Sequence, residues 1–226
     1  MDRGEQSGRR RAQLVDGVIA VGLTGAVGAG KSTALAVFAD LGALTFSADE
    51  AVHRIYERPE MRAALRARLG NEVLGAEGSV DRRAVSRRVT GDEEALRWLE
   101  ALVHPMVAHE IRSFLASVPL GSVVVCEVPL LVEVQTEPAF GLVVAIEAPA
   151  DLRRRRVAGR LSEEAFAVLD SRQATPAQRA VAADYVFVND GSAVALREFV
   201  VDVYRNSRAL LEAETREMSS DDSRSR

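Results

Sequence analysis

Cysteine and lysine each occur only once in this 226-residue sequence, and both scarcities limit what the chain can be. With a single thiol, at Cys126, no internal disulfide is possible, which fits a reducing compartment. Cys126 lies in the apolar run SVVVCEVP, so we interpret it as a small buried hydrophobe and not as a nucleophile.

Long apolar runs and an excess of positive charge are missing as well. No stretch of about 18 uninterrupted apolar residues occurs, and the first residues lack the apolar segment of a secretory signal. The formal net charge of −4 gives no general attraction to nucleic acid or to an anionic membrane. We therefore expect a cytoplasmic protein without nucleic-acid or membrane partners, in which any anion-binding site is local. A monomer is favoured, although the sequence does not determine the oligomeric state.

Short apolar runs separated by helical stretches predict the fold class. The runs are apolar at consecutive positions, which is typical of parallel strands covered on both faces. The pattern predicts an α/β fold, with a parallel five-stranded sheet flanked by helices. The predicted strands are residues 18–23, 43–46, 122–127, 141–146 and 185–188.

Uneven spacing between these runs predicts inserted segments, because the second and fourth intervals are longer than one crossover helix requires. Helix starts are expected from a capping box at Thr90 and Glu93, from Ser162, and from Thr175 with Pro176. Residues 1–15 are expected to be a disordered extension or the product of a mistaken start. The full division is a tail at 1–15, one domain at 16–215 (core 16–50, 118–150 and 183–215; helical insertion 51–117; lid 151–182), and a tail at 216–226.

The segment GAVGAGKST, residues 25–33, fits the phosphate-loop pattern G-x-x-x-x-G-K-S/T between a predicted strand and a predicted helix. Glycines let successive backbone amides point into one concavity, and the following helix adds its positive end. We expect ATP to bind here, with Mg²⁺ on the Ser32 hydroxyl and the Lys31 ammonium over the β and γ phosphates. A glycine-rich turn with a surface lysine is the alternative. The expected nucleotide-binding residues are Gly25, Ala26, Val27, Gly28, Ala29, Gly30, Lys31, Ser32 and Thr33.

The place of the single lysine is informative in two ways. The wide planar fork of arginine is a poor substitute for a compact ammonium inside so tight a loop, although all 28 other Lys and Arg residues are arginine. Guanine-specific GTPases recognise their base with an N-K-x-D signature, which would need a second lysine. A P-loop kinase is therefore favoured over that class.

Six segments together resemble the dephospho-CoA kinases, in the order found in that family: GLTGAVGAGKST, ADE at 48–50, LEALVHPMV at 99–107, EVPLLVE at 127–133, LSEEA at 161–165 and VNDG at 188–191. The resemblance implies transfer of the ATP γ-phosphate to the ribose 3′-hydroxyl of dephospho-CoA, the last step of coenzyme A synthesis. It also implies a P-loop NTPase-type core, a helical CoA-binding subdomain and a lid.

On the acceptor side, Asp49 matches the aspartate to which the family assigns the acceptor hydroxyl. A carboxylate following a parallel strand suits that task, although Asp49 could instead cap the next helix. The resemblance also implies acceptor binding by Arg82, His104, Glu127 and Leu130, and Glu127 could instead orient a magnesium-bound water. Pro105 is expected to end one helix and start another, holding His104 at a corner, and a histidine satisfied at a helix end is the alternative. Glu127 and Ser47 stand where the family commonly has aspartate.

On the donor side, Arg156 and Arg160 occupy the family's donor-phosphate positions, one helical turn apart. Arg156 is the expected catalytic arginine, because a guanidinium fork neutralises charge on a transferring phosphoryl group. The run RRRR at 153–156 is otherwise interpreted as a solvated face. Asn189, after the last predicted strand, is expected to contact adenine. The family's Asp-Gly pair before LS is absent.

Two other functions remain open: another small-molecule P-loop kinase acting on a nucleoside or a sugar, and a noncatalytic ATP-binding switch. Asp49, Glu127 and the lid arginines favour catalysis, because a switch needs no acceptor carboxylate.

Overall fold

The computed structural model describes residues 14, 15 and 17–222, with side chains described to residue 216. The chain divides into two compact units, residues 1–46 with 115–226, here called the core unit, and residues 47–114, here called the helical unit. Most of the expected N-terminal tail lies outside the described residues. Only Leu14 and Val15 of it are described, and Val15 forms a bridge with Val18.

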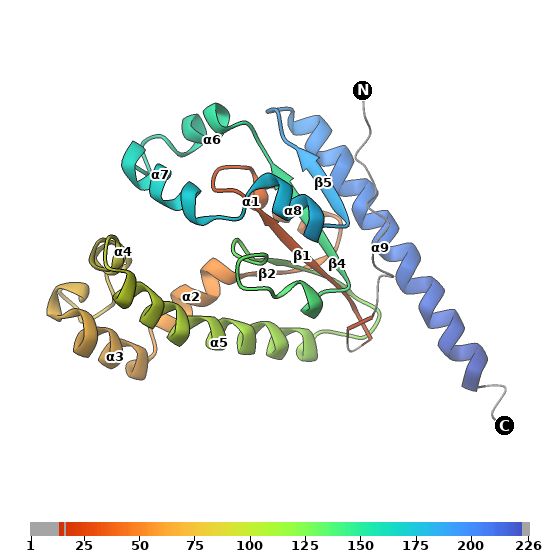
Figure 1. The fold of residues 1–226 in the computed structure, drawn as a ribbon. Coiled ribbons are helices and arrows are strands. Elements are labelled where there is room, and N and C mark those ends of the chain that lie inside the picture. The colour runs from red at the N-terminus through yellow and green to blue at the C-terminus, as the bar shows by residue number, and fades with distance from the viewer. Residues whose placement is uncertain (1–13, 16, 223–226) are drawn as a thin grey trace. The chain divides into compact units, whose positions relative to one another are not determined.

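A five-stranded sheet forms the centre of the core unit (Figure 1). The strand order is β2-β3-β1-β4-β5, and β1 pairs in parallel with both β3 and β4. Val21 of β1, for example, stands between Val125 and Leu142. The expected five-stranded parallel sheet is confirmed, with strand ends that differ by no more than two residues. The strands are β1 (Ile19–Gly25), β2 (Leu44–Ser47), β3 (Val123–Glu127), β4 (Leu142–Glu147) and β5 (Tyr185–Val188).

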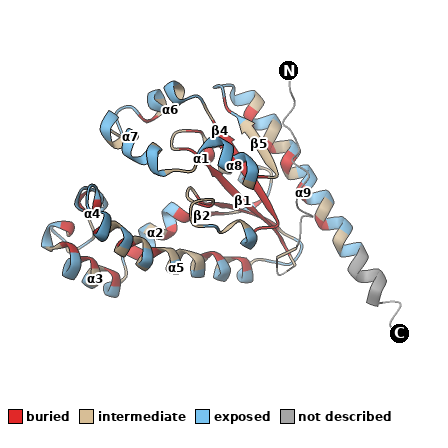
Figure 2. Cartoon of the chain, viewed as in Figure 1, coloured by how far each residue is buried: buried red, intermediate tan, exposed pale blue. Residues whose placement is uncertain are grey.

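One face of the sheet packs against α1 (Lys31–Asp40) and α9 (Ala193–Asp222). Every residue of β1 and β4 is buried, as Figure 2 shows in red. Because alternate residues of a strand point to opposite faces, every second residue of each central strand joins this cluster. Phe38 of α1 and Val200 of α9 are fully buried in it.

The opposite face is covered by the segment that follows β3 and by α8 (Pro176–Ala182). A Cβ added at Gly22 would lie 2.5 Å from the Leu131 side chain and 2.9 Å from Phe140, so glycine is needed for this close packing. Burial raises the pKa of the Cys126 thiol to about 12. The thiol is therefore neutral near pH 7, which agrees with the interpretation of Cys126 as a buried hydrophobe.

Three helices lie between β4 and β5, and two begin at the caps that the sequence predicts. They are α6 (Ala150–Val157), α7 (Glu163–Arg172) and α8. The Ser162 hydroxyl accepts the Ala165 amide at 3.2 Å and caps α7. Thr175 and Gln178 form a capping box on α8, with Pro176 at its first position.

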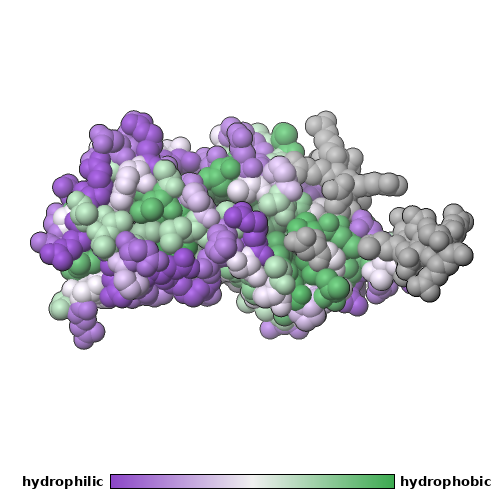
Figure 3. Space-filling model, turned by 90° about the horizontal axis from the view of Figure 1, so that it is seen from below, coloured by the Kyte–Doolittle hydropathy of each residue, from purple (hydrophilic) through white to green (hydrophobic). Residues whose placement is uncertain are grey.

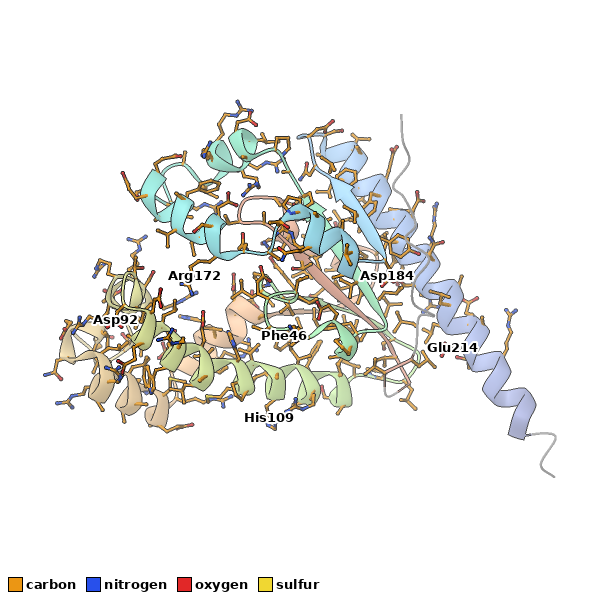
Figure 4. All side chains as sticks on the ribbon, viewed as in Figure 1. Phe46, Asp92, His109, Arg172, Asp184 and Glu214 are labelled. Carbon is orange, nitrogen blue, oxygen red and sulfur yellow. The ribbon has the colours of Figure 1, made fainter. Side chains whose placement is uncertain are left out.

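The helical unit contains α2 (Ala48–Tyr56), α3 (Pro59–Leu69), α4 (Arg82–Val89), most of α5 (Glu93–Ser117) and a short 3-10 turn at Asn71–Val73. Their apolar faces share a separate buried cluster. The predicted capping box at Thr90 and Glu93 is wrong. Asp92, labelled in Figure 4, accepts the Ala95 amide at 2.9 Å and caps α5, while the Thr90 hydroxyl donates to the Ser86 carbonyl at the end of α4.

Pro105 does not interrupt α5, so the predicted corner at His104 is wrong. A proline inside a helix removes one backbone hydrogen bond and costs about 3 kcal/mol. The apolar stripe continues on both sides of it, with Leu99 and Val103 before it and Ile111 after it all buried. Burial of that stripe outweighs the local cost.

The C-terminal helix is longer than the sequence predicts. α9 continues to Asp222, so the expected tail at 216–226 begins inside a helix, and residues 223–226 lie outside the described part. Near its end, the Glu214 carboxylate, labelled in Figure 4, accepts the Leu14 amide at 3.3 Å.

No helix in the described part of the chain is long and apolar enough to cross a membrane. The face drawn in Figure 3 carries both hydrophilic and hydrophobic side chains.

We predict that Gly25→Ala destabilises the protein by about 2 kcal/mol or more. Gly25 has φ of +145°, and an added Cβ would lie 2.0 Å from the Ile146 carbonyl oxygen on the neighbouring strand. The free energy of unfolding in urea measures the effect. Gly75→Ala is the matched control, because its Cβ would meet nothing closer than 3.5 Å, and a change within about 0.5 kcal/mol is expected. Equal effects of the two substitutions would contradict the steric account.

Candidate nucleotide-binding site

The loop between β1 and α1 has a shape that only glycine allows at three positions. Gly25, Gly28 and Gly30 have φ of +145°, +76° and +110°. Added Cβ atoms would lie 2.8 Å from the Arg153 carbonyl oxygen at Gly28 and 2.5 Å from the Asn189 side chain at Gly30. The predicted glycines are therefore required both by backbone conformation and by close neighbours.

Lys31 is the first residue of α1, and its side chain folds back over the loop. Its Nζ donates to the carbonyl oxygens of Gly25 at 3.0 Å and Ala26 at 3.1 Å, and the residue is only 8% exposed. A buried ammonium needs such partners, because desolvation of a charge is costly. The surface-lysine alternative is therefore wrong. The ammonium lies within the loop, where a phosphate chain would compete for it.

A hydroxyl and a carboxylate meet at the ends of α1 and β3. The Ser32 Oγ donates to Glu127 Oε1 at 3.2 Å; Ser32 is exposed, whereas Glu127 is 6% exposed. Glu127 is the last residue of β3, beside the end of β1, so its position follows from the parallel register. Both groups offer oxygen atoms, the ligands that Mg²⁺ prefers.

Within the described residues, no cluster of three His, Cys, Asp or Glu side chains could hold a metal. A Mg²⁺ ion commonly binds through one or two protein oxygens and otherwise takes water and phosphate oxygens. The Ser32–Glu127 pair fits such a site, and the remaining ligands would come from the nucleotide and from water.

Two of the predicted donor-side residues reach the loop from outside. Arg156 Nη1 donates to the carbonyl oxygens of Gly28 at 3.3 Å and Ala29 at 3.1 Å. Asn189 Nδ2 donates to the Ala29 carbonyl at 2.8 Å, and its Oδ1 accepts Arg156 Nη2 at 3.1 Å. Asn189, 4% exposed, thus holds loop backbone, and its contact with adenine remains a prediction. Arg160 is exposed, and its side chain donates to the Arg156 carbonyl at 3.1 Å.

The first arginine of the RRRR run is not a solvated residue. Arg153 is 7% exposed, and its Nη1 lies 2.6 Å from Asp170 Oδ1. Its guanidinium also lies over the Phe166 ring, 5.4 Å from the ring centre, and it reaches the Val27 carbonyl at 3.5 Å. Arg154 and Arg155 do form exposed surface ion pairs. The solvated-face interpretation is therefore wrong for Arg153. Its burial could have been inferred from its spacing of four residues from the apolar Val157, which places both on one face of α6.

A second residue that sequence reasoning missed is Gln173, directly after α7. Its Oε1 accepts the Val27 amide at 2.7 Å. No sequence pattern pointed to it, because the two residues lie 146 positions apart.

Of the acceptor-side residues, Asp49, Arg82 and His104 belong to the helical unit. Asp49 is exposed at the second position of α2 and does not cap it, because the Ser47 hydroxyl accepts the Glu50 amide at 3.4 Å. The capping alternative for Asp49 is therefore wrong. Serine and aspartate are both good caps, so Ser47 retains that function where the family has aspartate.

Arg82 is exposed at the start of α4. Burial raises the pKa of the Tyr56 phenol, and the positive charge of Arg82 offsets part of that rise. His104 is half-buried within continuous α5. Leu130 belongs to the core unit, in the turn after β3. It is partly exposed, whereas Leu131 beside it is fully buried against Gly22.

The comparisons with known proteins point to one family. The family model "CoaE: Dephospho-CoA kinase" matches residues 19–195. A dephospho-CoA kinase of Thiobacillus denitrificans is 40% identical over 186 residues, which cover 80% of this chain and 91% of that protein. One from Methylococcus capsulatus is 37% identical over 200 residues, covering 87% of this chain and all of that protein.

Solved structures share the fold. The crystal structure of TT1252 from Thermus thermophilus superposes with a TM-score of 0.70 at 31% identity, covering 82% of this chain and 95% of that one. A dephospho-CoA kinase from Campylobacter jejuni gives 0.58 at 24% identity, covering 84% and 97%, which supports the fold alone. The family model spans more than half of the chain, and these two curated relatives match it over 91% and 100% of their own length. This chain therefore belongs to the dephospho-CoA kinase family.

Proposed function

We propose that this chain transfers the γ-phosphoryl group of ATP to the ribose 3′-hydroxyl of dephospho-CoA, giving coenzyme A and ADP. The observation that carries the proposal is the glycine loop at the end of β1, with the Lys31 ammonium inside it and the Ser32–Glu127 pair beside it. Family membership supplies the acceptor.

The loop binds the donor through its backbone amides and the positive end of α1. When ATP enters, the Lys31 ammonium exchanges the Gly25 and Ala26 carbonyls for β- and γ-phosphate oxygens, which carry full negative charge. Arg156, which donates to the Ala29 carbonyl in the free protein, likewise exchanges this contact for phosphate oxygens. Its positive charge then stabilises the negative charge on the phosphoryl group during transfer. We keep Arg160 as a weaker donor-side candidate, because it starts from an exposed position.

Ser32 and Glu127 would hold Mg²⁺. The ion, when bound, neutralises phosphate charge and orients the phosphate chain. Glu127 is the last residue of a buried strand, so the sheet fixes its backbone, and the residue is 6% exposed.

On the acceptor side, the oxygen of the 3′-hydroxyl attacks the γ-phosphorus, and the Asp49 carboxylate accepts the hydroxyl proton. The new O–P bond forms as the bond between that phosphorus and the bridging oxygen breaks, and ADP leaves. Because the Ser47 side chain makes the capping hydrogen bond of α2, the Asp49 carboxylate is not needed to cap this helix. Arg82, His104 and Leu130 are proposed to bind the CoA portion.

The proposed partners are the two small-molecule substrates only. A monomer suffices, because every residue invoked belongs to one chain. The single buried thiol agrees with a cytoplasmic location.

The function is tested by measuring ADP release with dephospho-CoA, adenosine, pantetheine and no acceptor. We expect release to depend on dephospho-CoA, with coenzyme A as the product by mass spectrometry. Release with adenosine but not dephospho-CoA would indicate a nucleoside kinase instead. Nucleotide binding without acceptor-dependent release would indicate a noncatalytic switch.

Lys31→Met is expected to lower kcat at least about a hundredfold, because the ammonium charge that stabilises the phosphoryl group during transfer is lost. Lys31→Arg is expected to fail as well, since the planar guanidinium does not fit between the two carbonyls that Lys31 contacts. Steady-state kinetics and thermal unfolding of both variants provide the measurement. Full turnover by Lys31→Arg would show that any positive charge suffices.

Asp49→Asn is expected to lower kcat by about a hundredfold or more while changing the KM for ATP little, because the amide no longer accepts the hydroxyl proton. The matched control is Glu50→Gln, which removes the neighbouring exposed carboxylate in the same turn of α2. Equal kcat values for the two variants would remove Asp49 from the mechanism.

A further inference from the structure

The backbone of the phosphate loop is held by two kinds of side chain. The charged kind comprises Lys31, on the carbonyls of Gly25 and Ala26, Arg156, on those of Gly28 and Ala29, and Arg153, whose Nη1 lies 3.5 Å from the Val27 carbonyl. The neutral kind comprises the amides of Gln173, on the Val27 N–H, and Asn189, on the Ala29 carbonyl.

The two kinds respond differently to a phosphate chain. A cation gains a stronger, charge-assisted partner when it leaves a carbonyl for a phosphate oxygen. A neutral amide gains no comparable advantage. On the proposed use of the loop for ATP, Lys31 and Arg156 turn toward phosphate. Arg153 stays paired with Asp170, so the neutral amides and the 3.5 Å contact of Arg153 with the Val27 carbonyl continue to support the loop.

The Ala26–Val27 peptide is the unit that this change affects most. Its carbonyl accepts Lys31 Nζ at 3.1 Å, and on the opposite side of the same planar unit its N–H donates to Gln173 Oε1 at 2.7 Å. The Ala29 amide also donates to the Ala26 carbonyl, but this bond lies within the loop and moves with it. Once Lys31 turns to phosphate, Gln173 fixes this peptide relative to the rest of the core unit.

Gln173 is well placed for such a role because its own backbone is braced. The next residue, Ala174, donates its amide to Glu133 Oε1 at 2.6 Å, and its carbonyl accepts Arg179 Nη1. Arg179 is 2% exposed, and its Nη2 lies 2.7 Å from Glu147 Oε2 at the end of β4. Figure 4 labels Arg172, the residue before Gln173, at the end of α7.

We propose that Gln173 is a positioning residue for the phosphate loop: it holds the Ala26–Val27 peptide so that the loop amides keep facing the phosphates after Lys31 has moved. This inference rests on the proposed binding of ATP by the loop, but it does not depend on the identity of the acceptor.

The test is Gln173→Met, which keeps the length of the side chain and removes the acceptor oxygen. Gln178→Met is the matched control, because the Gln178 side chain bonds only with Thr175 in the capping box among the contacts described. We expect the Kd for ADP and the KM for ATP to rise together about three- to tenfold in Gln173→Met, the loss of one neutral hydrogen bond. The KM for dephospho-CoA is expected to stay within about twofold, and the control to match the unmodified protein in ADP binding.

An unchanged Kd for ADP in Gln173→Met would overturn the proposal, as would an equal loss of ADP affinity in the control.

Gln173→Glu retains an acceptor oxygen, and it is expected to protect the Val27 amide from hydrogen exchange where Gln173→Met does not. If Gln173→Met fails to fold, Gln173→Ala takes its place: the same rise in the Kd for ADP supports the proposal, and an unchanged Kd overturns it. ADP binding needs no acceptor, so a failure of dephospho-CoA turnover would refute the proposed function and leave this test intact.

Discussion

The structure of the phosphate loop depends on one buried ammonium group, that of Lys31. Lys31 lies against two carbonyl oxygens of the loop that precedes it, because a charge so far from water must find oxygen atoms. That arrangement requires a loop that curls tightly enough to present them, and hence glycines with positive φ at Gly25, Gly28 and Gly30. The glycines in turn let the backbone approach β4 and α6 more closely than any side chain would allow.

Support for the loop comes from elements far along the chain. Arg153 and Arg156 come from α6, Gln173 from the end of α7, and Asn189 from the end of β5. The segment between β4 and β5, which the sequence indicates as a lid, is therefore also part of the loop's framework. A movement of these helices and a change in the loop's backbone are coupled by direct hydrogen bonds.

Features with local signals could be predicted from the sequence. The strands follow from apolar runs, the loop from its glycine spacing, and the starts of α7 and α8 from Ser162 and Thr175. Each depends on residues a few positions apart. The choice of Asp92 over Thr90 as a cap shows the limit of such signals, because two good capping residues compete within one turn.

Features that depend on distant partners could not be predicted. The burial of Arg153 requires Asp170 and Phe166, and the role of Gln173 requires a backbone amide 146 residues away. Continuity of α5 through Pro105 reflects packing on both sides, which overrides the local preference of proline. The acceptor-side roles of Asp49, Arg82 and His104 remain predictions.

Because lysine occurs once in the chain, the only side-chain amine that a reagent can modify is the one in the phosphate loop. Apart from the α-amine, a reagent that acylates primary amines has a single target, and that target is the buried Lys31 nitrogen. An endoproteinase that cleaves after lysine would likewise divide the unfolded polypeptide at one bond, between Lys31 and Ser32. Modification or cleavage at this residue therefore reports directly on whether the loop is formed, without any engineered tag.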